Sequence, residues 1–231
     1  MFTNPSALDS RENGRSMTTE PTCWEELQVR LGLRASDLLH ASRLDRGRRV
    51  YCHEDKIFKV VALLEQETHR ERNNDLCSEF RILQHASSVS GIPQAREFFR
   101  LGGYEILIME KIDAHPLDQC RLTVCRWLCV FVRLAILLLR LSWKGIKHND
   151  ITRGNVLVSG YSHVHLIDFD QATSGGFWSC LRRNFCGARQ GEIDFNNHYF
   201  RLVRRSLKNN LSPVIVSRIQ RLRRLSGRGN P

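Results

Sequence analysis

Two carboxylates and a carboxamide surround a pair of short apolar segments in the second half of the chain. Asp150 and Asn155 come before the first segment, residues 156–158, and Asp168 comes directly after the second, residues 164–167. The polar residues between the two segments favour a turn, so we expect a hairpin that brings the three polar ends together. Carboxylate and amide oxygens suit a hard divalent cation. This compact stretch is therefore the strongest chemical signal in the chain.

The spacing within this stretch resembles a known motif. A His-x-Asp triplet ends at Asp150, Asn155 follows five residues later, and an Asp-Phe pair begins at Asp168, thirteen residues after Asn155. The ordered set resembles the catalytic loop and metal motif of protein kinases and their relatives. The resemblance covers about residues 43–172. It implies an α+β, two-lobed protein-kinase-like fold, with a small β-rich N-lobe and a reduced, mainly helical C-lobe.

The same resemblance implies a reaction and a role for each motif residue. Phosphoryl transfer from ATP depends on positioning and on charge neutralisation, largely by Mg²⁺. By the resemblance, Asn155 and Asp168 are the metal ligands, and Asp150 orients the acceptor hydroxyl and takes its proton. His148 is expected to hold the loop by hydrogen bonding to the backbone.

Upstream residues fit the same family pattern. Lys59, on the second strand of a predicted hairpin, stands where the family places the lysine that binds the α- and β-phosphates of ATP. A lone lysine on a strand would mean little without the downstream motif. For its acidic partner we choose Glu79, which shares a helix face with apolar residues, and Glu67 and Glu71 remain alternatives.

The nucleotide base and phosphates should meet further groups. Residues 107–112 resemble the fifth strand and hinge of the family, where backbone groups of Glu110 and Ile112 would bind adenine and Met109 would limit the back of the pocket. No Gly-x-Gly-x-x-Gly precedes Lys59, and Gly47 stands alone among arginines. We therefore expect Gly47 and Arg48 to cover the phosphates, with Arg46 and Arg49 as alternatives for direct charge-assisted hydrogen bonds.

Other departures place the chain among small atypical kinases. Asn149 replaces the arginine that receives an activation-loop phosphate, and no Ala-Pro-Glu follows Asp168, so regulation by loop phosphorylation is not expected. Asp170 replaces the glycine of Asp-Phe-Gly. The resulting Ile-Asp-Phe-Asp is similar to bacterial lipopolysaccharide-core sugar kinases of the Kdo type. Residues 47–52, before the lysine strand, and residues 178–183, after the metal motif, show a weaker resemblance to the YrbL-like family.

The elements that must position these residues can be read from hydrophobic periodicity and turn residues. We expect a disordered N-terminus at residues 1–22, a lead-in helix and kinase N-lobe at 23–110, and a kinase C-lobe with basic C-terminal helices at 111–231. The predicted elements are a lead-in helix at 24–40, strands at 50–52 and 57–61, a helix at 63–85, strands at 96–100 and 104–109, and an apolar helix at 127–143. Arg126, Arg133 and Arg140 should form one polar stripe on that last, mostly buried helix.

The charge is concentrated at one end of the chain. Residues 181–231 hold twelve Lys and Arg against Glu192 and Asp194, a net of +10 out of +11 for the whole chain. Such an end attracts an anionic membrane or another polyanion. A basic helix at 213–228 suits a membrane surface and equally suits packing under the large lobe with its arginines solvated.

The eight cysteines lack zinc-ligand spacing, and no signal peptide or transmembrane segment is recognised. We therefore expect a cytoplasmic protein, peripheral at the inner membrane face if the basic end binds lipid.

Three functions follow. The first is a kinase that uses ATP and Mg²⁺ to phosphorylate a hydroxyl of a protein (Ser/Thr) or of a cell-surface glycolipid sugar. The second is an RNA- or ribosome-associated atypical kinase or ATPase resembling the RIO or Bud32 type, with the basic end as its nucleic-acid footprint. The third is a pseudokinase scaffold, which is disfavoured because Lys59, Asp150, Asn155 and Asp168 occur together.

Overall fold

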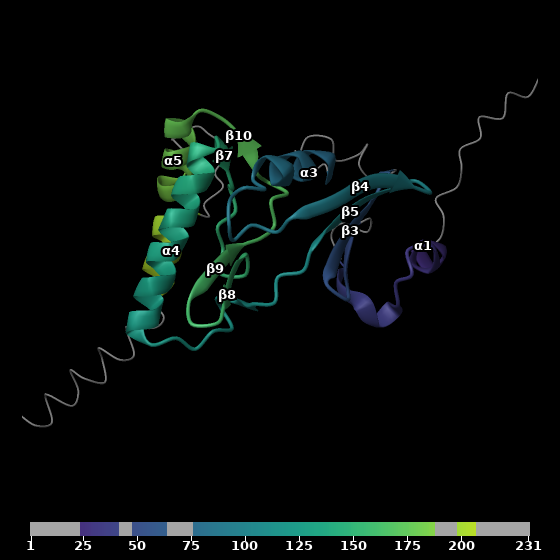
Figure 1. Cartoon of the computed structure of the whole chain (residues 1–231), viewed down its shortest axis with the longest axis horizontal. Coiled ribbons are helices and arrows are strands. Elements are labelled where there is room, and N and C mark those ends of the chain that lie inside the picture. Colours follow the sequence, from purple (N-terminus) through teal and green to yellow (C-terminus); the bar gives the residue numbers. More distant parts are fainter. Residues whose placement is uncertain (1–23, 42–47, 64–75, 188–197, 207–231) are drawn as a thin grey trace, which may run out of the picture.

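The fold has a β-rich lobe and a mainly helical lobe (Figure 1). The computed structural model describes residues 24–41, 48–63, 76–187 and 198–206. In the first lobe an antiparallel sheet has the order β1-β2-β3-β5-β4 and carries helices α1 and α3. The α+β, two-lobed kinase-like fold predicted from the sequence is confirmed. The bounds in this lobe are α1 Trp24–Arg30, a 3-10 turn Ala35–Asp37, β1 Leu38–Ala41, β2 Arg48–His53, β3 Lys56–Ala62, α3 Leu76–His85, β4 Ala95–Leu101 and β5 Tyr104–Glu110.

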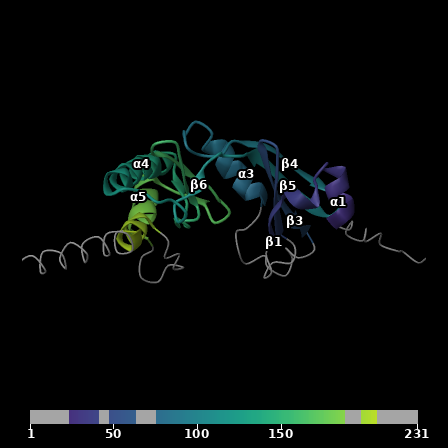
Figure 2. The ribbon, with the colours of Figure 1, turned by 90° about the horizontal axis from the view of Figure 1, so that it is seen from below.

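The second lobe combines short strands with two helices. The strands form a three-stranded sheet in the order β6-β8-β9 and a separate pair, β10 with β7. Helix α3 lies between the large sheet and the helices of this lobe, as both views show (Figure 2). Residues 199–206 are also helical. The bounds are β6 His115–Pro116, α4 Val124–Trp143, β7 Ile146–Lys147, β8 Val156–Ser159, β9 His163–Leu166, β10 Thr173–Ser174 and α5 Phe177–Cys186.

The two predicted hairpins of the first lobe are present. In the β2–β3 hairpin, Val50 pairs with Lys59, and Glu54 in the turn has a φ of 53°. In the β4–β5 hairpin, Gly102 and Gly103 both adopt positive φ, which glycine does at little steric cost. The predicted hairpin of the catalytic stretch is also present as β8 and β9, with Val156 paired to Leu166.

The predicted helix at 24–40 is wrong in its second half. Helix α1 ends at Arg30, where Gly32 has a φ of 66° and the amides of Gly32 and Leu33 donate to Val29 O and Gln28 O. This pair of bonds is a Schellman cap, which favours glycine at the left-handed position. The chain then enters β1, which pairs with β2 at the sheet edge. Helix α3, Leu76–His85, confirms the second part of the helix predicted at 63–85. Residues 64–75 lie outside the described residues.

Helix α4 is longer and more exposed than predicted. Its N-cap is Thr123, whose hydroxyl accepts from the Arg126 amide. One face is buried in the core, but the opposite face exposes a row of apolar side chains, so the expectation of a mostly buried helix is wrong. This happens because α4 lies at the outer edge of its lobe (Figure 1). The exposed side chains are Val124, Leu128, Val132, Ile136, Leu139 and Trp143.

The arginine stripe of α4 runs beside this apolar row. Arg126 donates hydrogen bonds of 2.9 Å to the carbonyls of Gly160 and Tyr161 in the β8–β9 turn, and Arg133 lies 3.3 Å from His163 Nδ1. The stripe therefore connects α4 to the hairpin. Within the described part of the chain, no helix is both long and apolar enough to cross a membrane.

One apolar core extends across both lobes. It joins Leu76 and Leu83 of α3, Leu107 of β5, and Leu134 and Leu138 of α4. A second, smaller core lies on the other side of the large sheet and includes Leu27 of α1. Burial of each such leucine contributes about 1.5–3 kcal/mol. The shared core therefore holds β3 and α3 in place against the β8–β9 hairpin.

Candidate active site

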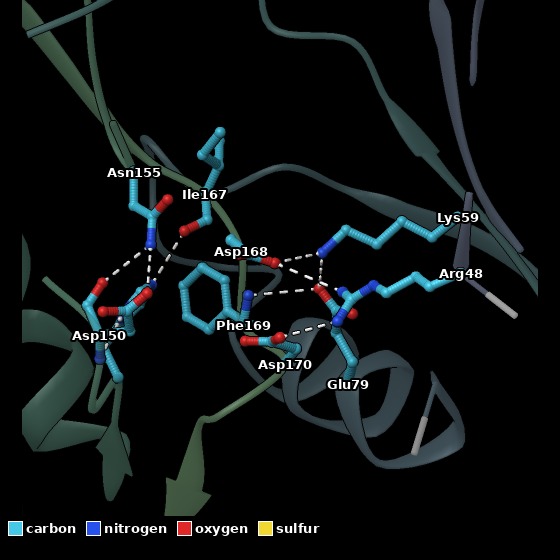
Figure 3. Close-up of polar contacts among 10 residues, drawn as sticks. Arg48, Lys59, Glu79, Asp150, Asn155, Ile167, Asp168, Phe169 and Asp170 are labelled. Atoms are coloured by element: carbon cyan, nitrogen blue, oxygen red, sulfur yellow. Dashed lines mark hydrogen bonds and ion pairs between the residues drawn. The ribbon is translucent and has the colours of Figure 1, made fainter. Parts of the chain in front are cut away.

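A buried lysine connects three elements at the junction of the lobes. Lys59 Nζ on β3 lies 2.7 Å from Glu79 Oε1 on α3 and 2.6 Å from Asp168 Oδ1, two residues after β9 (Figure 3). The structure thus brings Lys59 to Glu79, the acid chosen from the sequence. Glu67 and Glu71 lie outside the described residues.

The alternation of β3 explains why Lys59 points into this site. Phe58 and Val60 face the smaller core, whereas Ile57 and Val61 pack against the larger one. Because successive side chains of a strand point to opposite faces, Lys59 lies on the same face as Ile57 and Val61, toward α3. A charged residue on a buried face needs partners of opposite charge, and Glu79 and Asp168 supply them.

The charges around Lys59 stabilise one another. Burial alone would lower the pKa of the Lys59 ammonium, but the attraction of Glu79 and Asp168 outweighs burial and raises it. Burial likewise favours the neutral form of Asp168, yet Lys59 and Arg48 hold the pKa of that carboxyl below its ordinary value. Both groups are therefore charged at neutral pH.

The backbone around Asp168 is strained and held from both sides. Asp168 has a φ of 66°, a conformation that costs a non-glycine residue of order 1–3 kcal/mol. The amide of Phe169 donates to Glu79 Oε1 at 3.2 Å, and the Phe169 ring packs edge-on against His148 at 4.6 Å. The strained turn is thus fixed by α3 on one side and by His148 on the other.

His148 connects the loop before β8 with the end of β9. Its Nε2 lies 3.0 Å from the Ile167 carbonyl, which only accepts, so Nε2 carries the proton. Nδ1 then accepts from the Asp150 amide at 3.3 Å. Burial lowers the pKa of the imidazole, which keeps His148 neutral. The side chain makes the backbone hydrogen bonds that the sequence predicted.

Asp150 and Asn155 are bonded directly to each other. Asn155 Nδ2 donates to the Asp150 carbonyl at 3.0 Å and to Asp150 Oδ2 at 2.8 Å. The amide of Ile167 donates to Asn155 O, which ties this pair to the strand that leads into Asp168. Figure 3 shows Asp150 and Asn155 on one side of the segment from Ile167 to Asp170, and Lys59, Arg48 and Glu79 on the other. Both halves of the predicted constellation therefore meet at this segment, with the Asp168 carboxylate turned toward the cations.

Arg48 and Asp170 form an ion pair that the sequence did not reveal. Arg48 Nη1 lies 2.9 Å from Asp170 Oδ2, and Arg48 Nη2 lies 3.7 Å from Asp168 Oδ1. The second oxygen of Asp170, Oδ1, is buried and has no hydrogen-bond partner among the residues that the structure describes. The available signal was that Asp170 stands where the family pattern has glycine, and that Arg48 follows Gly47 in a segment without the glycine-rich motif. Gly47 and Arg46, also proposed to cover the phosphates, lie outside the described residues.

The predicted hinge follows directly after β5. The Glu110 amide donates to Gln94 O at 2.9 Å, so this N–H is already used. Of the two Glu110 backbone groups, only the carbonyl is therefore left for the predicted contact with adenine. Among the described residues, the Ile112 amide donates to no acceptor, and its carbonyl accepts from Ala114. Met109 is buried in the larger core.

Helix α5 fixes the loop at residues 148–150 through two buried polar residues to which the sequence assigned no role. Asn184 Oδ1 accepts from the His148 amide at 2.9 Å, and Arg183 Nε donates to Asn149 Oδ1 at 3.0 Å. Asn149 has a φ of 65°, and its Nδ2 donates to the Gln171 carbonyl. These contacts set the position of Asp150. The one signal in α5 was the weak YrbL-like resemblance of residues 178–183, which assigned no role to Arg183 and did not reach Asn184.

The donor atoms at this site are oxygens of the kind that a magnesium ion takes. Because Asn155 Nδ2 is used by Asp150, its Oδ1 remains as a ligand, and Asp168 and the unpartnered Asp170 Oδ1 add carboxylate oxygens. Across the described residues, no three His, Cys, Asp or Glu side chains form a metal-binding group. Magnesium takes one or two carboxylates together with substrate phosphates, so a smaller protein ligand set suffices.

Comparison with known proteins finds solved structures of similar shape. No protein-family model matches the chain, and no curated protein matches it. A crystal structure of WbdD is similar to it with a TM-score of 0.49 and 20% sequence identity. The similarity covers 72% of this chain and 44% of WbdD, so the chain matches less than half of the length of that protein.

Proposed function

We propose that the chain is a kinase that transfers the γ-phosphate of ATP to a hydroxyl with the help of Mg²⁺. The observation that carries this proposal is the position of Lys59 Nζ, 2.7 Å from Glu79 and 2.6 Å from Asp168. A lysine that is buried beside two carboxylates, at the junction of a sheet and a hairpin, suits the phosphates of a nucleotide.

Asn155 and Asp168 would hold the metal ion, as their free oxygens allow. When bound, Mg²⁺ supplies charge neutralisation of the triphosphate. Asp168 would exchange its contact with Lys59 for the ion, and Lys59 would then donate to phosphate oxygens while it keeps Glu79. Arg48 lies beside the same carboxylate at 3.7 Å and adds a second cation.

Asp150 would position the acceptor. Its Oδ2 accepts from Asn155 Nδ2, which fixes the plane of the carboxylate, and its amide is held by His148. A carboxylate oriented in this way can accept a hydrogen bond from an acceptor hydroxyl and take its proton as the phosphoryl group arrives. A hydroxyl-bearing protein or a glycolipid sugar satisfies this requirement.

The test is phosphoryl transfer or ATP hydrolysis by purified protein with labelled ATP and Mg²⁺. Asp150→Ala and Asp168→Ala should each lower turnover about 100-fold or more, since a positioned base or metal ligand contributes at least that factor. Glu97→Gln, at an exposed position of β4, is the matched control and should leave turnover unchanged. Absence of turnover in the wild-type chain, or turnover that survives both substitutions, would refute the proposal and favour a scaffold.

A further inference from the structure

A small cavity lies directly beside the loop that connects Asp150 to Asn155. Its volume is about 270 Å³. Residues 151–154 of that loop form one wall, Asp118 contributes from the segment after β6, and Arg201, Leu202 and Arg205 contribute from the helical residues 199–206. The cavity is thus built from three segments that are far apart in the sequence, and one of them begins at the residue after Asp150.

The lining of the cavity is strongly basic. Arg153, Arg201 and Arg205 contribute three guanidinium groups against the single carboxylate of Asp118, a formal charge of +2. Arg153 lies over the Trp127 ring at 5.8 Å, and its Nη2 makes a long hydrogen bond of 3.5 Å to Leu117 O. Arg205 forms no ion pair with any residue that the structure describes. Guanidinium groups match phosphate and carboxylate oxygens in geometry as well as in charge.

The arginines of the third segment are held by packing. Arg201 and Arg205 are four residues apart and lie on one face of the helical residues 199–206. Leu202 is buried in the larger core, and the Tyr199 hydroxyl donates to Phe131 O of α4 at 3.2 Å. The helical segment that carries Arg201 and Arg205 is therefore anchored in the folded lobe.

The wall of the cavity is joined to Asp150 by short hydrogen bonds. The Thr152 amide donates to the Asp150 carbonyl at 3.1 Å, and the Thr152 hydroxyl accepts from the Asn155 amide at 3.2 Å. A group bound against Thr152 and Arg153 is consequently held at a fixed place relative to the Asp150–Asn155 pair. The volume is below the ~300–1,000 Å³ that whole small-molecule ligands occupy, and it suits a single anionic group.

We propose that this cavity binds a phosphate or carboxylate group of the acceptor and thereby presents a neighbouring hydroxyl of the acceptor to Asp150. The proposal rests on the proposed kinase function and narrows its substrate class to acceptors that are already anionic. Asp118 limits the positive charge on one side of the cavity and leaves a single acidic edge, which can accept a hydrogen bond from a hydroxyl of the same acceptor.

The first test measures binding without catalysis. Glucose 6-phosphate and galacturonate serve as phosphate and carboxylate probes in titration calorimetry, with uncharged galactose as the blank. The double variant Arg201→Gln/Arg205→Gln should bind the preferred anionic probe on the order of tenfold or more weakly, because each substitution removes a charge-assisted hydrogen bond to the anion. Arg204→Gln, on the same helix but outside the cavity lining, should bind like the wild type. Thermal unfolding confirms that all variants are folded.

The second test separates this inference from the proposed function. Labelled-ATP hydrolysis and fluorescent-nucleotide binding are measured for the same variants. The inference predicts that both stay at the wild-type level in Arg201→Gln/Arg205→Gln, while probe binding falls. If the chain turns over ATP but all variants bind the probe equally well, the inference is overturned and the proposed kinase function stands. A parallel loss of nucleotide affinity would assign the cavity to ATP, and probe binding by a chain without any ATP turnover would overturn the acceptor role together with the proposed function.

Discussion

Arg48 and Asp170 form a 2.9 Å ion pair across the two lobes, between the first residue of β2 and the segment that follows β9. Both side chains are mostly buried. In the kinase pattern that the chain resembles, each of these regions is characterised by glycine. The two departures therefore compensate each other, because the carboxylate that replaces one glycine balances the guanidinium that stands near the other.

This pairing predicts strong coupling between substitutions. Arg48→Met leaves the buried Asp170 carboxylate without its partner and should lower the free energy of unfolding by about 3 kcal/mol, since removal of one member of a buried ion pair is strongly destabilising. The double variant Arg48→Met/Asp170→Gly should recover much of that loss. Urea unfolding of the two single variants and the double variant measures the coupling, and additive effects would contradict it.

We expect substitution of Lys59 to lower turnover and substitution of Lys56, on the same strand, to leave it unchanged. Lys59→Met removes the cation between Glu79 and Asp168 and should lower ATP turnover by a factor of about 100–1,000, the range found when one charge-stabilising donor is removed from an active site. Lys56→Met, at the start of β3, is the matched control because Lys56 belongs to the same strand and is partly exposed. Initial rates at saturating ATP compare the two, and equal losses would contradict a special role for Lys59.

The buried imidazole of His148 predicts a pH dependence of stability. Its pKa is lowered in the folded state, so the unfolded chain takes up the proton first as the pH falls. The stabilisation is present above the ordinary histidine pKa of about 6.5 and is lost below it, by up to about 1.4 kcal/mol per pH unit for one proton. His148→Gln should reduce this slope between pH 6.5 and 5, whereas exposed His115→Gln should not. Urea unfolding at several pH values measures both slopes.

Much of the fold follows from local patterns, and what did not follow depends on distant contacts. The β2–β3 hairpin was predictable because alternation and turn residues are recorded in neighbouring residues. The placement of Glu79 beside Lys59 was predictable from the family resemblance together with the helix face of Glu79. Strand β1 was not predictable, because the apolar spacing of residues 24–40 is typical of a helix and does not record the pairing of β1 with β2. Gly32 interrupts that helix. Apolar residues around the whole of α4 do not say which face stays exposed. The Arg48–Asp170 pair joins residues 122 positions apart, and no periodicity records such a contact.

The buried contacts of Asn184 allow a prediction of how strongly α5 supports the loop at residues 148–150. Its Oδ1 accepts from the His148 amide, and its Nδ2 donates to Ser142 Oγ and to Ile146 O, all at 2.9–3.0 Å and in a buried environment. Asn184→Ala leaves the His148 amide without its acceptor and removes one donor from Ser142 Oγ and from Ile146 O, and an unsatisfied buried group costs about 1–3 kcal/mol. We expect a loss in that range or above in urea unfolding, together with reduced turnover at unchanged nucleotide affinity. Asn184 holds the His148 amide, and the His148 ring in turn accepts from the Asp150 amide, so the substitution acts on the position of Asp150. Ser179→Ala, at an exposed position of α5, should change neither quantity. A variant at Asn184 that is destabilised but turns over ATP at the wild-type rate when folded would show that α5 stabilises the lobe without positioning Asp150.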